Sequence, residues 1–171
     1  IGPDNLEQPL GLQDLFPETL PPSDSPSQAG LDDVPTMITR LAQRLEQNPS
    51  NPDGWRMLGW SYMATDQAQK AAKAYAQAME LKGDVAQYRS AYGEALVKVA
   101  SGKVTPDAKA AFDSALAIDS DDAQARYFVG LWKKQNGDAA GAYEVWATLL
   151  KDAPRNAPFL DDLGTDMASL A

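Results

Sequence analysis

Cysteine and histidine are both absent from this sequence of 171 residues. Their absence excludes thiolate nucleophiles, Ser-His and Cys-His catalysis, imidazole metal ligands and a CxxCH haem-attachment segment. Carboxylates would have to supply all acid-base chemistry, and no paired arrangement of them stands out. Short clusters that contain Asp are typical of turns and helix N-caps, and no EF-hand loop fits them: Gly83-Asp84, Asp121-Asp122, Asn136-Gly137-Asp138 and Asp161-Asp162. We therefore predict that the chain is not an enzyme and holds no metal or cofactor.

Long apolar runs are also missing, since no stretch approaches the roughly 18 apolar residues that a membrane span requires. The net charge of −9 is unevenly distributed. Residues 1–33 contain seven of the 24 acidic residues and none of the 15 basic ones, so the rest of the chain is nearly neutral. Neither part carries the basic stripe that nucleic acid or an anionic membrane surface attracts. The sequence predicts no nucleic-acid partner and no direct membrane contact from this chain.

Six of the twelve prolines lie within residues 1–30, where little periodicity is present. Such a segment contains too little apolar surface to offset the entropy of ordering it. We predict that residues 1–34 form an acidic, proline-rich linker or tail. Its leucine-bearing part, "LEQPLGLQDLF", is able to dock as an extended segment.

A helical repeat begins after this tail. Its first copy contains two successive helices, and each has a set of residues that lie on one face. The first set is Trp55, Leu58, Gly59 and Tyr62, and the second is Ala71, Tyr75 and Ala78. On a frame of about 34 residues this closely resembles the tetratricopeptide (TPR) motif. The glycine and the alanines allow two helices to pack closely, and the larger residues fill the core between them. Later copies place Gly93 with Phe112 and Gly130 with Trp146 at equivalent positions.

The repeat predicts an all-α fold, a TPR superhelix of three helix pairs flanked by a single helix at each end. Its domain covers residues 35–171 and consists of a half-repeat 35–51, repeats 52–85, 86–122 and 123–156, and a capping helix 157–171. The second repeat is about three residues longer than the frame. Its surplus lies in the loop "SGKVTP", where Thr105 is predicted to cap a helix that begins at Pro106.

In stacked TPR pairs, the first helices line a concave groove. The residues predicted to line it are Arg56, Trp60, Met63, Ser90, Glu94, Val97, Tyr127, Leu131 and Lys134. An apolar floor with a few charges suits an amphipathic helix that docks through side chains three and four positions apart. Trp60 has two further interpretations, since the capping helix or the leucine-bearing tail could cover it.

Two longer stretches indicate a family. "LAQRLEQNPSNPDGWRMLGWSYMA" and "SGKVTPDAKAAFDSALAIDSDDAQARYFVGLW" resemble the periplasmic TPR domain of the CcmI/CycH family of cytochrome c biogenesis proteins. The resemblance covers about residues 36–156. It implies a bacterial periplasmic domain, tethered to the inner membrane by two preceding helices. It also implies a role as chaperone, in which the groove holds the C-terminal amphipathic helix of apocytochrome c for the haem-ligation machinery.

Two other functions agree with the same residues. A general TPR scaffold would assemble other periplasmic or envelope proteins through the same groove. An oligomerisation module would bury Trp60 and Leu131 against another copy of the chain.

Overall fold

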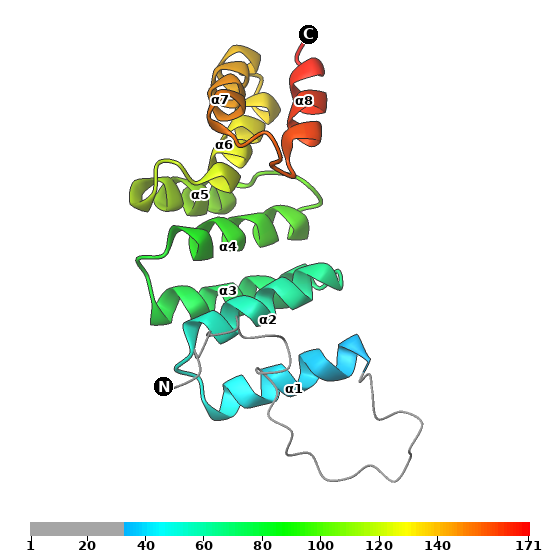
Figure 1. The fold of residues 1–171 in the computed structure, drawn as a ribbon, viewed down its shortest axis with the longest axis vertical. Helices are drawn as coiled ribbons and strands as arrows, with labels where there is room; N and C mark the ends of the chain where they lie inside the picture. The colour runs from blue at the N-terminus through cyan, green and yellow to red at the C-terminus, as the bar shows by residue number, and fades with distance from the viewer. Residues whose placement is uncertain (1–32) are drawn as a thin grey trace, which may run out of the picture. The chain divides into compact units, whose positions relative to one another are not determined.

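The computed structural model describes residues 33–171, so the predicted tail lies almost entirely outside the described residues. This part of the chain contains eight α-helices and no strand (Figure 1). The helices are α1 (Val34–Gln47), α2 (Pro52–Ala64), α3 (Ala68–Leu81), α4 (Ala86–Val99), α5 (Pro106–Ile118), α6 (Ala123–Gln135), α7 (Ala139–Asp152) and α8 (Leu160–Ala168).

The helices of this part pack in chain order. α2 pairs with α3, α4 with α5 and α6 with α7, and each pair packs on the next one. A single helix lies at each end, α1 against α2 and α8 against α7 (Figure 1). The predicted fold class, an all-α TPR arrangement of three pairs between two single helices, is confirmed.

Side-chain caps set where several of these helices begin. Thr105 Oγ1 accepts a hydrogen bond from the Ala108 amide at 3.2 Å, directly before Pro106, as predicted. Asn51 caps α2 in the same way, also directly before a proline. Asp122 and Asp138 accept amide hydrogen bonds at the starts of α6 and α7. These carboxylates satisfy amide groups that have no partner within the helix.

The pairs are close-packed through a glycine on the first helix and an aromatic ring on the second. A Cβ atom placed on Gly59 would lie 2.6 Å from a ring carbon of Tyr75, and one on Gly93 would lie 2.6 Å from Phe112. Gly130 meets the indole of Trp146 in the same way. No side chain fits between the helices at these points, which explains the repeated glycine.

Candidate functional site

The first helices form a hollow of about 480 Å³ between α2, α4 and the start of α6. Four of the nine residues predicted for the groove line it, namely Arg56, Trp60, Ser90 and Glu94. Three carboxyl groups that the prediction did not include, those of Asp119, Asp121 and Asp122, complete the wall toward α6. We call this hollow the α2–α4–α6 groove.

Trp60 is the most exposed large apolar residue of the described part, with 65% of its surface accessible to solvent. Its neighbour Gly59 is buried against Tyr75 in the α2–α3 contact. Successive residues of a helix are about 100° apart, so Trp60 turns away from this contact and faces the groove. Neither the capping helix nor another described element buries it, and the alternative of a covering tail lies outside the described residues.

Glu94 of α4 lines the groove. Its carboxylate accepts a hydrogen bond from the side-chain amide of Gln124 on α6, which links the two helices. Burial raises the pKa of Glu94, while this hydrogen bond and the Lys98 ammonium group oppose the rise. Burial also raises the pKa of the Tyr75 phenol to about 12, an effect that Glu94 increases and Arg56 reduces. Tyr75 therefore stays neutral near pH 7.

Two of the polar groove residues are already engaged within the chain. The Arg56 guanidinium donates to Asp53 at 2.8 Å. Ser90 is buried, and its hydroxyl group lies 3.1 Å from the Asp122 carboxylate that caps α6. Ser90 therefore joins α4 to α6 and contributes to the wall of the groove, instead of offering a free hydroxyl group.

Met63 and Val97 do not line the hollow. Val97 is only 5% exposed and belongs to one core cluster with Val104 and Phe112. Met63 packs against the cluster that contains Tyr75 and Ala95. Val97 is buried because Val104, which lies in the lengthened loop, packs in the same cluster. The helical frame of α4 alone does not predict this contact.

The last three predicted groove residues contact α8 or the residue that follows it. The Tyr127 hydroxyl group donates to the Asp166 carboxylate, and Lys134 donates to Ser169 at 2.7 Å. Leu131 packs in the cluster that contains the fully buried Leu163 of α8. Burial and the Asp166 carboxylate raise the pKa of Tyr127. The apolar side chains of α8 are buried against α6 and α7. This helix therefore covers Tyr127, Leu131 and Lys134, the residues that the third repeat was predicted to contribute to the groove.

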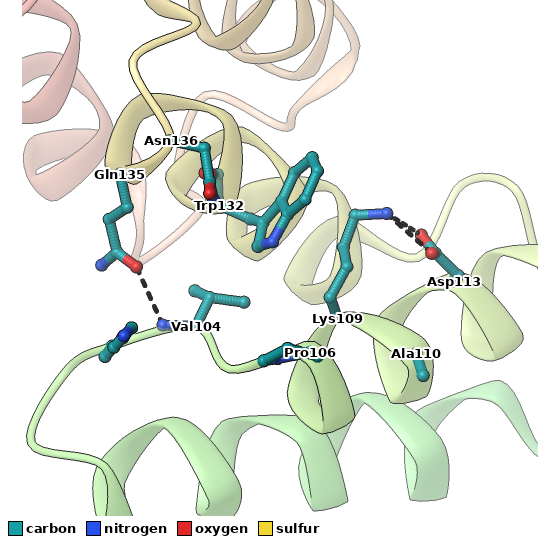
Figure 2. Close-up of a pocket in the computed structure, with 9 residues that line it drawn as sticks. Val104, Pro106, Lys109, Ala110, Asp113, Trp132, Gln135 and Asn136 are labelled. Carbon is teal, nitrogen blue, oxygen red and sulfur yellow. Dashed lines mark hydrogen bonds and ion pairs between the residues drawn. The ribbon is translucent and has the colours of Figure 1, made fainter.

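A second hollow, of about 720 Å³, lies beside the lengthened loop between α4 and α5 (Figure 2). The side chain of Gln135 holds this loop, since it accepts from the Val104 amide and donates to the Gly102 carbonyl, both at 2.8 Å. On the opposite wall, the Lys109 ammonium group lies 4.6 Å from the centroid of the Trp132 ring and also binds Asp113. The remaining charged residue of this lining, Lys103, has no ion pair within the described residues.

Within residues 33–171, no group of three or more acidic side chains is placed to hold a metal ion. Over the same residues, no helix combines the length and the apolar character that crossing a membrane requires. The α2–α4–α6 groove combines an exposed aromatic ring with several carboxylates on one surface.

Curated proteins with related sequences include proteins named for cytochrome c biogenesis. The chain is 33% identical over 152 residues to the cytochrome c-type biogenesis protein CycH of Bradyrhizobium diazoefficiens, covering 88% of this chain and 41% of that protein. It is 35% identical over 140 residues to CycH of Rhizobium meliloti, covering 82% and 37%. The formate-dependent nitrite reductase complex subunit NrfG of Escherichia coli O157:H7 is 29% identical over 119 residues, with 69% and 60% covered. The chain thus spans about two fifths of the length of the CycH proteins.

Solved structures share the fold at lower identity. MamA superposes with a TM-score of 0.67 at 18% identity, covering 88% of this chain and 84% of MamA. A thermophilic TPR protein of Thermus thermophilus superposes with a TM-score of 0.62 at 19% identity, covering 84% and 76%. Residues 22–159 match the family described as "Cytochrome c-type biogenesis protein H TPR domain". The chain therefore belongs to the family of cytochrome c-type biogenesis protein H TPR domains.

Proposed function

We propose that this chain is a non-catalytic TPR module of cytochrome c maturation that holds apocytochrome c. In this role the α2–α4–α6 groove binds the C-terminal amphipathic helix of the apocytochrome and presents the rest of it to the haem-ligation machinery. The family membership and the names of the CycH and NrfG relatives support a role in cytochrome c maturation.

The observation that carries the proposal is the exposed indole of Trp60 beside the groove. A large aromatic side chain in water is favourable to cover, and tryptophan is among the residues that contribute most to binding at protein interfaces. A helix that lays its apolar face on Trp60 would bury this surface without any change in the helix pairs. Helix-in-groove docking is a common mode of peptide recognition.

The proposed location is the bacterial periplasm, with the domain tethered to the inner membrane by segments outside this sequence. Its support is the resemblance to the CcmI/CycH family, whose members span more sequence than this chain does. In such a place, the absence of cysteine would also prevent mixed disulfides with the reduced CxxCH segment of a bound apocytochrome.

Calorimetric titration with the C-terminal helix peptide of a c-type apocytochrome tests the proposal, with a scrambled peptide of the same composition as control. We expect micromolar or tighter binding of the native order alone. Trp60→Ala should weaken this binding by about 2 kcal/mol and leave stability nearly unchanged. Tyr143→Ala is the matched control variant, because Tyr143 is 55% exposed on α7 and lies outside the groove.

Equal binding of both peptides, or equal effects of the two variants, would contradict the proposal. If the folded protein binds neither peptide, the result would favour the alternative function, a TPR scaffold that binds another partner. Light scattering on the same samples would show whether a second copy of the chain occupies the groove instead.

A further inference from the structure

The wall of the α2–α4–α6 groove carries an excess of negative charge. Glu94 projects from α4. Asp119 and Asp121 lie in the turn before α6, and Asp122 is the N-cap residue of α6. The lining includes one cationic side chain, that of Arg56. That guanidinium is already paired with Asp53 at 2.8 Å, outside the acidic wall.

Within residues 33–171, no lysine or arginine forms an ion pair with any of these four carboxylates. Three of the four carboxylates accept hydrogen bonds from neutral groups. Gln124 donates to Glu94, the Asp121 amide donates to Asp119 at 2.9 Å, and the Ala125 amide donates to Asp122 at 2.8 Å. These hydrogen bonds hold the carboxylates of Glu94, Asp119 and Asp122. The Lys98 ammonium group acts on Glu94, but no ion pair within the described residues balances the charge of this wall.

The acidic wall and the exposed indole belong to one hollow, so a single ligand can contact both. We propose that the groove selects a cationic amphipathic helix, which places a lysine or arginine against Glu94 and Asp121 and an apolar side chain on Trp60. Side chains three or four positions apart lie on one face of a helix, so one helical turn supplies both contacts. This inference rests on the proposed function and specifies the chemistry of the helix that the groove accepts.

Electrostatic complementarity is the physical reason for this selection. Glu94 is partly desolvated, so an incoming cation meets a charge that water screens less than it screens a surface carboxylate. A helix with glutamates at the same positions would be repelled, and complementary charge chiefly determines which partner binds. An arginine would additionally be able to donate two parallel hydrogen bonds to one carboxylate.

Three designed helical peptides with one apolar face test the selection. They carry lysine, glutamine or glutamate at the positions flanking that face, and their affinities are measured by calorimetry at low and high salt. We expect the lysine peptide to bind at least about fivefold more tightly than the glutamine peptide, and the glutamate peptide to bind least. The difference between lysine and glutamine should shrink at high salt, because screening weakens the charge interaction.

The double variant Glu94→Gln, Asp121→Asn should lose the preference for lysine, so that the lysine and glutamine peptides bind it about equally. The matched control, Asp84→Asn with Glu144→Gln, changes the net charge equally at exposed sites outside the groove and should keep the preference. Since burial raises the pKa of Glu94, its ionisation opposes folding as pH rises through that pKa. The substitution Glu94→Gln should therefore leave the midpoint of urea unfolding unchanged or raise it.

Equal affinities for the three peptides would overturn the selection, and so would an equal loss of preference in both double variants. Absence of binding by all three would overturn it as well. The proposed function is judged separately by the apocytochrome peptide. If that peptide binds while the designed series shows no preference, only the cationic selection fails. If the designed series shows the preference and the apocytochrome peptide does not bind, only the proposed client fails.

Discussion

At the scale of single residues, three glycines determine how closely the helices of each pair approach. Gly59, Gly93 and Gly130 each lie under an aromatic ring of the partner helix. Gly164 occupies the corresponding place on α8, but a Cβ atom there would have no neighbour within 4 Å. The same residue type in the same helical frame therefore has a packing role in three places and none in the fourth.

Gly93→Ala should destabilise the protein by about 1–3 kcal/mol, because the methyl group would overlap the Phe112 ring in a close-packed contact. Urea unfolding measures the difference. Gly164→Ala is the control and should be neutral, or stabilising by up to about 1 kcal/mol, since alanine favours the helix more than glycine does. Destabilisation of similar size by both variants would show that the ring contact is not the cause.

At the scale of elements, Gln135 of α6 fixes the lengthened loop. Its two hydrogen bonds reach the Val104 amide and the Gly102 carbonyl, and Figure 2 shows the contact with Val104 beside the second hollow. The loop contains Ser101 and Gly102 at positive φ angles of 54° and 95°, so its backbone is not in a relaxed extended form. The Gln135 side chain from the next repeat adds two hydrogen bonds to the backbone hydrogen bonds within this loop.

Gln135→Ala should cost about 1–2 kcal/mol, because the half-buried Val104 amide loses its partner. Amide hydrogen exchange should accelerate over residues 101–105 more than in α2 and α3. Gln69→Ala, on the α3 helix and without a hydrogen bond to the loop, is the control for removing a glutamine side chain and should change neither quantity. Unchanged exchange of the loop in Gln135→Ala would show that the loop is held by other contacts.

Sequence reasoning succeeded where an answer depends on one helix and its direct partner. The frame predicted that the repeat glycine allows close approach of the paired helix, because periodicity fixes the angular position of a residue on its own helix. The structure shows this approach at Gly93, which lies against Phe112. The frame did not predict that α8 covers Tyr127, or that Val97 is buried. Those outcomes depend on how a short cap and an irregular loop lie against neighbouring helices. The sequence indicated only that Asp121 lies in a turn. Its position beside α4 depends on how the helix pairs pack on one another, which local periodicity does not give.

At the scale of the domain in residues 33–171, each helix pair contacts only the elements next to it. The buried residues accordingly form four clusters along the chain instead of one central core. In arrays of this kind, stability is approximately a sum of repeat and nearest-neighbour terms. Damage at one end should therefore stay local.

Leu163→Ala, at a fully buried position of α8, should cost about 2–5 kcal/mol through the cavity it leaves. Hydrogen exchange should then accelerate in α6, α7 and α8 and remain nearly unchanged in α2 and α3. Leu58→Ala, at a buried position of α2, is the reciprocal variant and should give the opposite pattern. Uniform acceleration along the whole domain in either variant would indicate a single cooperative unit.

The positions of the four tryptophans give the protein its own set of optical probes. Trp60 is largely in water, whereas Trp146 is fully buried and donates its indole hydrogen to the Tyr127 carbonyl at 2.9 Å. Trp60 should therefore emit at long wavelength and Trp146 at short wavelength, with the half-buried Trp55 and Trp132 between these extremes. A quencher dissolved in the buffer would reach the first indole and not the second. Occupancy of the groove and integrity of the far repeat can thus be followed separately, in one cuvette and without a label.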